Sequence, residues 1–170
     1  PDQLAELFQV SLIYPQIIPF VHVDPRRKNI LELVKKCVEQ WNYKGIKLYP
    51  PLGTFPYDEG FWPIYEYAQS MNLPVLTHCS PYNPVHFKGS RKELLQLLGK
   101  AKQPIDTQGK KIKELCANFT HPMNFVEVIK QFPSLRICFG HLGSQYFWDQ
   151  FIHHPSNPDN WLRIIRDLCI

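Results

Sequence analysis

The chain has 170 residues, of which 44% are hydrophobic and 20% charged, a composition typical of one globular domain with a sizeable core. Apolar runs of about 18 residues are absent from the sequence, so no membrane-spanning helix and no membrane partner are expected. The five cysteines are odd in number and widely spaced, which favours reduced thiols in a cytoplasmic protein over a disulfide framework.

The net charge of +4 is concentrated in one segment, from Lys88 to Lys113. This segment holds eight Lys and Arg residues against Glu93 and Asp106, which gives it a net charge of +6. A local basic segment indicates a local anionic partner, and it argues against a nucleic-acid-binding domain. We therefore expect a small-molecule substrate and no nucleic acid, and a homo-oligomer stays open.

The hydrophobic pattern predicts alternating helices and strands along the chain. In chain order these are a helix end over 2–10, a strand over 17–24, a helix over 29–41, a strand over 45–49, a helix over 61–71, a strand ending at His78, a helix over 124–131, a strand ending at His141 and a helix over 160–168. A loop with Pro155 and Pro158 is expected between the last strand and the last helix. Such alternation predicts parallel βαβ units, with all carboxyl ends of the strands at one edge of the sheet.

The segment from Pro81 to Asn118 is unusually long for a connection between a strand and a helix. It holds two short helical patterns, over 91–98 and 110–117. Because it follows the strand that ends at His78, we expect it on the functional edge of the sheet as a lid-like insertion over about 81–120. A solvated insertion without a function is the alternative.

Two apolar strands end in a histidine and then turn. Leu73–Ser80 delivers His78, and Leu135–Gly143 delivers His141. Two imidazoles at the carboxyl ends of neighbouring parallel strands can hold a metal ion or a proton-transfer group. Each histidine could instead merely end its strand. No strand is followed by Gly-x-Gly-x-x-Gly, so a dinucleotide site is not supported.

Other polar residues are weaker candidates. Lys47 lies within an apolar strand, so its side chain must reach a polar opening or be desolvated. His22 and Asp24 share one face of a strand, but Asp24 precedes Pro25 and could equally form a turn. A thiol enzyme using Cys79 beside His78 is disfavoured, because adjacent strand residues point to opposite faces. Aromatic residues near the strand ends could line a pocket or simply pack, namely Tyr49, Trp62, Tyr82, Phe147 and Trp148.

Three segments in this order resemble the amidohydrolase superfamily, in particular the amidohydrolase-2 branch, which includes aminocarboxymuconate-semialdehyde decarboxylase. They are Gly45–Pro50, then Pro63–Tyr65 with Leu73–His78, and then His121–Phe125 through Phe132–Arg136 to Gly140–Gly143. The resemblance implies an α/β fold made of parallel (β/α) units of a distorted TIM-like barrel. About four of the eight strands are present, and they resemble the third to the sixth.

The resemblance also implies roles for individual residues. His78 matches a metal ligand on the fifth strand, and His141 matches either a second ligand or a catalytic acid/base on the sixth. Lys47 is implied as a catalytic residue that is not a ligand, and His121 as a substrate-binding residue. Tyr49 and Trp148 are expected to bind substrate because of their place near the strand ends. The implied cofactor is Zn²⁺ or another divalent metal. The implied activity is that of a hydrolase or non-oxidative decarboxylase, which attacks a small, carboxylate-bearing substrate through a metal-activated water.

The chain departs from the family pattern, because the first-strand His-x-His pair and the eighth-strand Asp have no counterparts. Neither His22-Val23-Asp24 nor His153-His154 replaces them. We therefore expect residues 1–170 to be a single, partial barrel domain that belongs to a longer chain. The alternative is a non-catalytic half-barrel that serves as a structural or interaction module.

Overall fold

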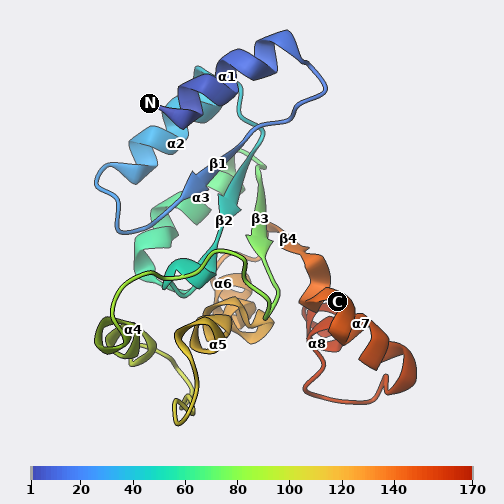
Figure 1. Cartoon of the computed structure of the whole chain (residues 1–170). Helices are drawn as coiled ribbons and strands as arrows, with labels where there is room; N and C mark the ends of the chain where they lie inside the picture. Colours follow the sequence, from blue (N-terminus) through green and yellow to red (C-terminus); the bar gives the residue numbers. More distant parts are fainter. Residues whose placement is uncertain (1, 170) are drawn as a thin grey trace.

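The computed structural model describes residues 2–169 and contains one sheet of four parallel strands (Figure 1). The strands are β1 (Phe20–Val23), β2 (Gly45–Leu48), β3 (Pro74–His78) and β4 (Arg136–Gly140), and they lie in the order β1-β2-β3-β4. This confirms the predicted α/β class and the parallel (β/α) units. Most of the strands are shorter than predicted, because their ends turn out of the sheet at residues such as Pro19 and Pro50.

Helices alternate with the strands, and the sequence pattern predicts all of them except α7. They are α1 (Gln3–Ile13), α2 (Ile30–Glu39), α3 (Trp62–Ser70), α4 (Arg91–Leu98), α5 (Ile112–Cys116), α6 (Val126–Gln131), α7 (Ser144–His153) and α8 (Trp161–Leu168). Local signals fix several starts: Ser90 and Glu93 form a capping box at α4, and Asn160 caps α8 by accepting from the amides of Leu162 and Arg163. Within residues 2–169 none of these helices has the length and apolar character needed to cross a membrane.

Helix α7 corrects the sequence prediction, which placed a loop between β4 and the last helix. It has no buried residue, and its apolar side chains Trp148 and Ile152 are 44% and 68% exposed. A helix without a buried stripe gives only a weak amphipathic signal. What holds α7 is Phe147, whose ring stacks on Trp161 of α8 at 5.1 Å, and whose carbonyl accepts from Asn160 Nδ2 at 2.9 Å.

The two faces of the sheet have different surroundings. Val21, Ile46 and Val75 are fully buried, in register with one another across the first three strands. They pack against apolar side chains of the helices in the main core. The other face carries the alternate residues of the strands and is not covered in this way. The sheet therefore has one core face and one open face.

The long segment after β3 brings a second, smaller core. Leu94 and Leu98 of α4 pack with Leu115 of α5 and with Phe119, and Phe55 from the loop after β2 joins them. Figure 1 shows α4 and α5 beyond the carboxyl ends of the strands. The insertion is thus a packed unit, and its role as a lid stays a prediction.

Candidate functional site

Three ionisable side chains lie on the open face of the sheet, in a row that Leu76 interrupts. The strand register pairs His22 with Lys47, Lys47 with Leu76, and Leu76 with Cys138. His22 and Cys138 are exposed, and Lys47 is half-buried. In a parallel barrel this face would be the interior, where alternate residues of each strand point inward. The row therefore lies below the strand ends where the two histidines emerge.

His78 is the last residue of β3 and the most buried of the predicted site residues, with 5% of its surface exposed. Its ring lies beside the ring of Tyr49, with centroids 4.7 Å apart, and beside the ring of His141, with centroids 4.9 Å apart. The structure thus brings together Tyr49, His78 and His141, which the sequence places on three successive strand ends.

His141 is exposed and sits in an unusual turn after β4. Its φ is 68°, and the φ angles of Leu142, Gly143 and Ser144 are also positive, at 46°, 83° and 77°. Each non-glycine residue in this region costs on the order of 1–2 kcal/mol, so the surrounding structure must hold the turn. The Gly143 amide donates to the carbonyl of Cys79 at 2.9 Å, which ties the turn to the chain just after His78.

Asn83 is the functional candidate that the sequence analysis missed. Only 1% of it is exposed, and its Oδ1 lies 2.9 Å from Nε2 of His78. Asn83 Nδ2 donates to the carbonyl of Pro81, which turns Oδ1 toward the imidazole. Nε2 of His78 therefore carries the proton, and Nδ1 carries the lone pair that can bind a metal or accept a proton. Only the polar character of an asparagine five residues after a strand-end histidine could have indicated this contact.

Burial, together with the neighbouring His141 and Lys47, lowers the pKa of His78 to about 4. The hydrogen bond to Asn83 and the Tyr82 backbone oppose this shift. The imidazole of His78 is therefore neutral at pH 7, the form that ligates metals. Burial also lowers the pKa of Lys47, and Cys138 opposes that shift.

His22 and Asp24 belong to the open face but not to the histidine pair. The pKa of His22 is lowered, mainly by burial. The charge of Asp24 opposes this shift, and that of Lys47 adds to it. Asp24 accepts from the Arg26 amide at 2.9 Å and forms an ion pair with the Arg26 guanidinium at 2.5 Å. Asp24 is therefore engaged in the turn after β1, as the turn alternative predicts.

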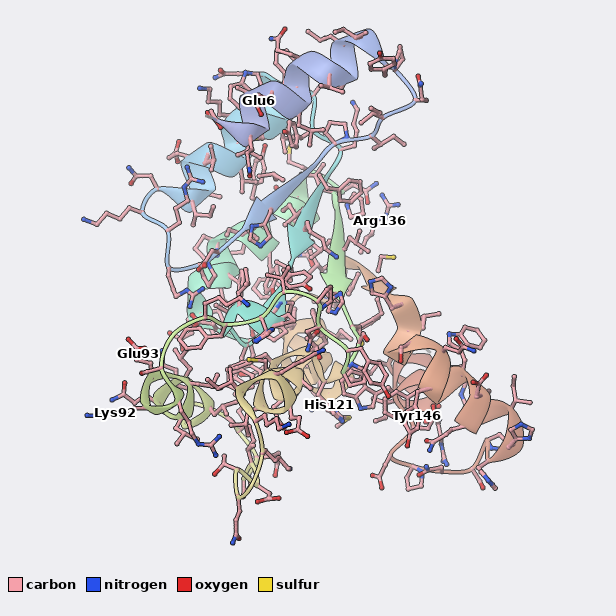
Figure 2. All side chains as sticks on the ribbon, in the orientation of Figure 1. Glu6, Lys92, Glu93, His121, Arg136 and Tyr146 are labelled. Carbon is pink, nitrogen blue, oxygen red and sulfur yellow. The ribbon has the colours of Figure 1, made fainter. Side chains whose placement is uncertain are left out.

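His121 and Trp148, two predicted substrate-binding residues, do not contact the ring of His78 in the way that Tyr49 does. His121 lies beyond the carboxyl ends of the strands (Figure 2), where its ring packs edge-on against Trp161 at 4.9 Å. Its Nδ1 accepts from the Met123 amide and so caps a short 3-10 turn, Pro122–Phe125. Trp148 lies on α7 and is 44% exposed. For both residues substrate binding stays a prediction.

The donor set at the strand ends fits part of a metal site. His78 and His141 provide two imidazoles within reach of one ion, since ring centroids 4.9 Å apart suit two nitrogens about 2 Å from a shared metal. Catalytic zinc sites usually have three protein ligands and a water. Among residues 2–169, no group of three or more His, Cys, Asp or Glu side chains is placed to hold an ion. The described residues therefore offer two imidazole donors here, fewer than the three protein ligands of a usual catalytic zinc site.

Comparison with known proteins finds a matching family model and a similar solved structure. A family model described as Amidohydrolase matches residues 10–164. Among solved structures, the chain is similar to 4-oxalomesaconate hydratase from Rhodopseudomonas palustris, with a TM-score of 0.51 and 20% sequence identity over 85% of this chain. The match covers 40% of the length of that hydratase, and at this identity it speaks for the fold alone. No curated protein matches the chain.

Proposed function

The chain belongs to the amidohydrolase family, and we propose that it carries part of the active site of a metal-dependent hydrolase or non-oxidative decarboxylase. The family match over residues 10–164 confirms the resemblance inferred from the three sequence segments. The finer proposal rests on one observation, the pairing of His78 and His141 at neighbouring strand ends with ring centroids 4.9 Å apart. The substrate that we propose is small and carries a carboxylate.

His78 would bind a divalent metal such as Zn²⁺ through Nδ1, because its Nε2–H donates a hydrogen bond to Oδ1 of Asn83. His141 would be the second ligand, or it would exchange a proton with the substrate, since its side chain is exposed. A divalent metal bound there supplies Lewis acidity that makes water nucleophilic at neutral pH. The missing ligands would come from outside residues 2–169.

Lys47 supports a substrate with a negative charge. It lies on the open face, one strand away from β3, and is close enough to lower the pKa of His78. Because burial is only partial, its ammonium group can attract a carboxylate without the full cost of a buried charge. Tyr49 would flank the same substrate, since its ring already lies beside His78.

A non-catalytic half-barrel is the second candidate function. The observation that favours it is the two-histidine donor set, which is incomplete for catalytic zinc among the described residues. A half-barrel without a complete metal site would act through its surfaces, as a structural or interaction module.

Metal binding distinguishes the two candidates. Calorimetric titration of the 170-residue chain with Zn²⁺ should show about one ion bound per chain, with an affinity that falls about tenfold or more in His78→Ala and in His141→Ala. The control is the double variant His153→Ala/His154→Ala, which removes two exposed imidazoles of another segment. If Zn²⁺ binding follows the control pair and is indifferent to His78 and His141, the metal site is wrong and the half-barrel module stands.

A further inference from the structure

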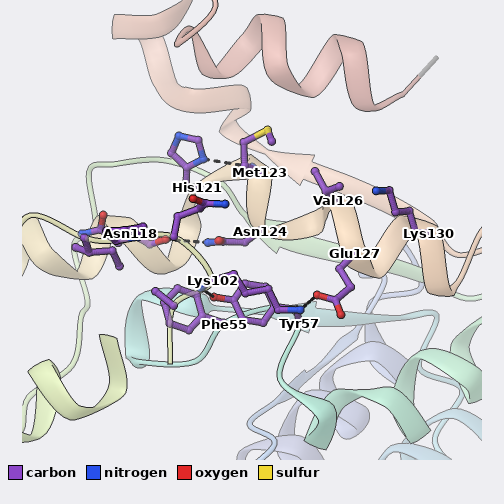
Figure 3. Close-up of a pocket in the computed structure, with 14 residues that line it drawn as sticks. Phe55, Tyr57, Lys102, Asn118, His121, Met123, Asn124, Val126, Glu127 and Lys130 are labelled. Carbon is purple, nitrogen blue, oxygen red and sulfur yellow. Dashed lines mark hydrogen bonds and ion pairs between the residues drawn. The ribbon is translucent and has the colours of Figure 1, made fainter. Parts of the chain in front are cut away.

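A pocket of about 710 Å³ lies between the insertion and the segment that leads into α6 (Figure 3). One wall is the loop of residues 101–105, and the other wall runs from residue 118 to residue 130. None of His78, His141, Tyr49 or Lys47 lines it. Its volume is in the range of pockets that bind small molecules, about 300–1,000 Å³. The proposed function makes no use of this pocket.

The pocket has an aromatic floor. Phe55 and Tyr57 stack with ring centroids 4.9 Å apart and planes 7° from parallel. Phe55 is buried in the second core, while Tyr57 is partly exposed. Ile105 and Val126 add apolar surface from the two walls. These side chains favour a flat, apolar body that lies against the Tyr57 ring.

The far wall is held in place by its own hydrogen bonds. Asn124 Nδ2 donates to the carbonyl of Asn118 at 2.8 Å and to that of Phe119 at 3.2 Å. The Met123 amide donates to His121 Nδ1 at 3.3 Å, and Figure 3 shows this bond beside the pocket. Since these contacts stay within the wall, the pocket is formed before any ligand arrives, which limits the ordering cost of binding.

The rim carries an excess of positive charge. Lys102 lies over the Tyr57 ring, with Nζ 4.9 Å from the centroid, and it forms an ion pair with Glu127 across the pocket. Both of these side chains remain about half exposed. Lys130 follows Glu127 on the same helix and also lines the pocket. Two ammonium groups therefore face one carboxylate at the mouth.

We propose that this pocket binds a small, flat, apolar molecule with one anionic group, such as an aromatic carboxylate. The flat body lies on Tyr57 between the two walls. The anion takes the place of the Glu127 carboxylate beside Lys102, so the ligand competes with Glu127. The site is separate from the strand-end histidines and needs no metal.

The test uses two fluorescent probes of matched shape. Anilinonaphthalenesulfonate is flat, apolar and anionic, and N-phenylnaphthylamine lacks the charge. We expect the anionic probe to bind about threefold more weakly to Lys102→Gln and about threefold more tightly to Glu127→Gln. The uncharged probe should bind equally to both variants. Lys92→Gln, on the exposed surface of α4, is the matched charge control and should leave both affinities unchanged.

Filling the pocket provides an independent test. Val126→Phe and Met123→Trp each add volume to the same wall, and Met123 is 51% exposed, so its substitution leaves the core untouched. In each variant that retains the wild-type circular dichroism spectrum, both probes should bind about tenfold more weakly or not at all. Unchanged probe binding in Met123→Trp, or equal anionic-probe affinity in Lys102→Gln and Glu127→Gln, would overturn the proposal.

Discussion

His78 owes its chemistry to neighbours that come from three separate segments. Tyr49 and His141 flank its ring, and Asn83 fixes which nitrogen is protonated. Its burial keeps it neutral, with a pKa of about 4. A ligand histidine must be neutral and correctly oriented, and its remaining nitrogen is normally held by a hydrogen-bond acceptor. Asn83 meets that requirement.

The role of Asn83 can be tested by changing the charge of the acceptor. Asn83→Asp places a carboxylate beside Nε2, which stabilises the imidazolium and should raise the pKa of His78 by about 1–3. An NMR pH titration of the histidine ring protons measures this pKa directly. Asn72→Asp, in an exposed turn, is the matched control and should leave the titration of His78 unchanged. A His78 titration that is the same in Asn83→Asp and in the wild-type chain would show that Asn83 does not hold the ring.

Among single residues, the sequence pattern predicted His78 and His141 but not the contact of Asn83 with His78. A histidine at the end of an apolar strand is visible in the pattern, and the parallel order places two such histidines side by side. Asn83 lies in a polar loop, and its contact depends on how residues 79–83 fold back over the strand end. That fold is set by tertiary bonds such as Thr120 Oγ1 to the Ser80 carbonyl at 2.8 Å, which no local pattern reveals.

Among the elements, the turn after β4 sets both the position of His141 and the start of helix α7. Gly143 has a φ of 83°, and a Cβ there would lie 2.9 Å from Cβ of Trp161 and 3.1 Å from Cβ of Phe147. The close approach of α8 to the turn thus requires glycine. The same packing of Phe147 on Trp161 supports α7.

Replacing Gly143 and Gly109 in separate variants distinguishes the energetic cost of close packing from that of the backbone conformation. Gly109 also has a positive φ, 68°, but has open space where its Cβ would be. We expect Gly109→Ala to lower the free energy of unfolding by about 1 kcal/mol, from the backbone alone. Gly143→Ala should lower it by about 1–3 kcal/mol more, because neighbouring side chains must also shift. Urea denaturation measures both values, and equal losses in the two variants would contradict the packing at the turn.

The elements also show where sequence patterns lose information. Helices α2 and α4 were predicted within two residues of their ends, because apolar residues at helical spacing mark them. Helix α7 was predicted as a loop, since none of its side chains is buried and Pro155 follows closely. Helix α7 is stabilised by contacts with α8, which begins seventeen residues after the start of α7. The hydrophobic periodicity of a segment does not indicate such contacts.

At the scale of the whole molecule, the open face of the sheet explains the incomplete site. In a closed barrel both faces of every strand are covered, and the strands around the ring contribute ligands to one centre. Here one face carries His22, Lys47 and Cys138 in partly exposed positions. The chain spans 40% of the length of the solved hydratase that it resembles. We therefore expect the proposed site to need further ligands beside His78 and His141.

We propose that His78 and His141 bind one divalent metal together. Long-range proton–nitrogen NMR of the chain labelled with ¹⁵N at histidine resolves each imidazole nitrogen during a Zn²⁺ titration. We expect the resonances of Nδ1 of His78 and of one nitrogen of His141 to shift together, with saturation near one equivalent of Zn²⁺, while those of His153 and His154 stay unchanged. Zn²⁺-dependent shifts confined to His153 and His154, with the resonances of His78 and His141 unmoved, would contradict it.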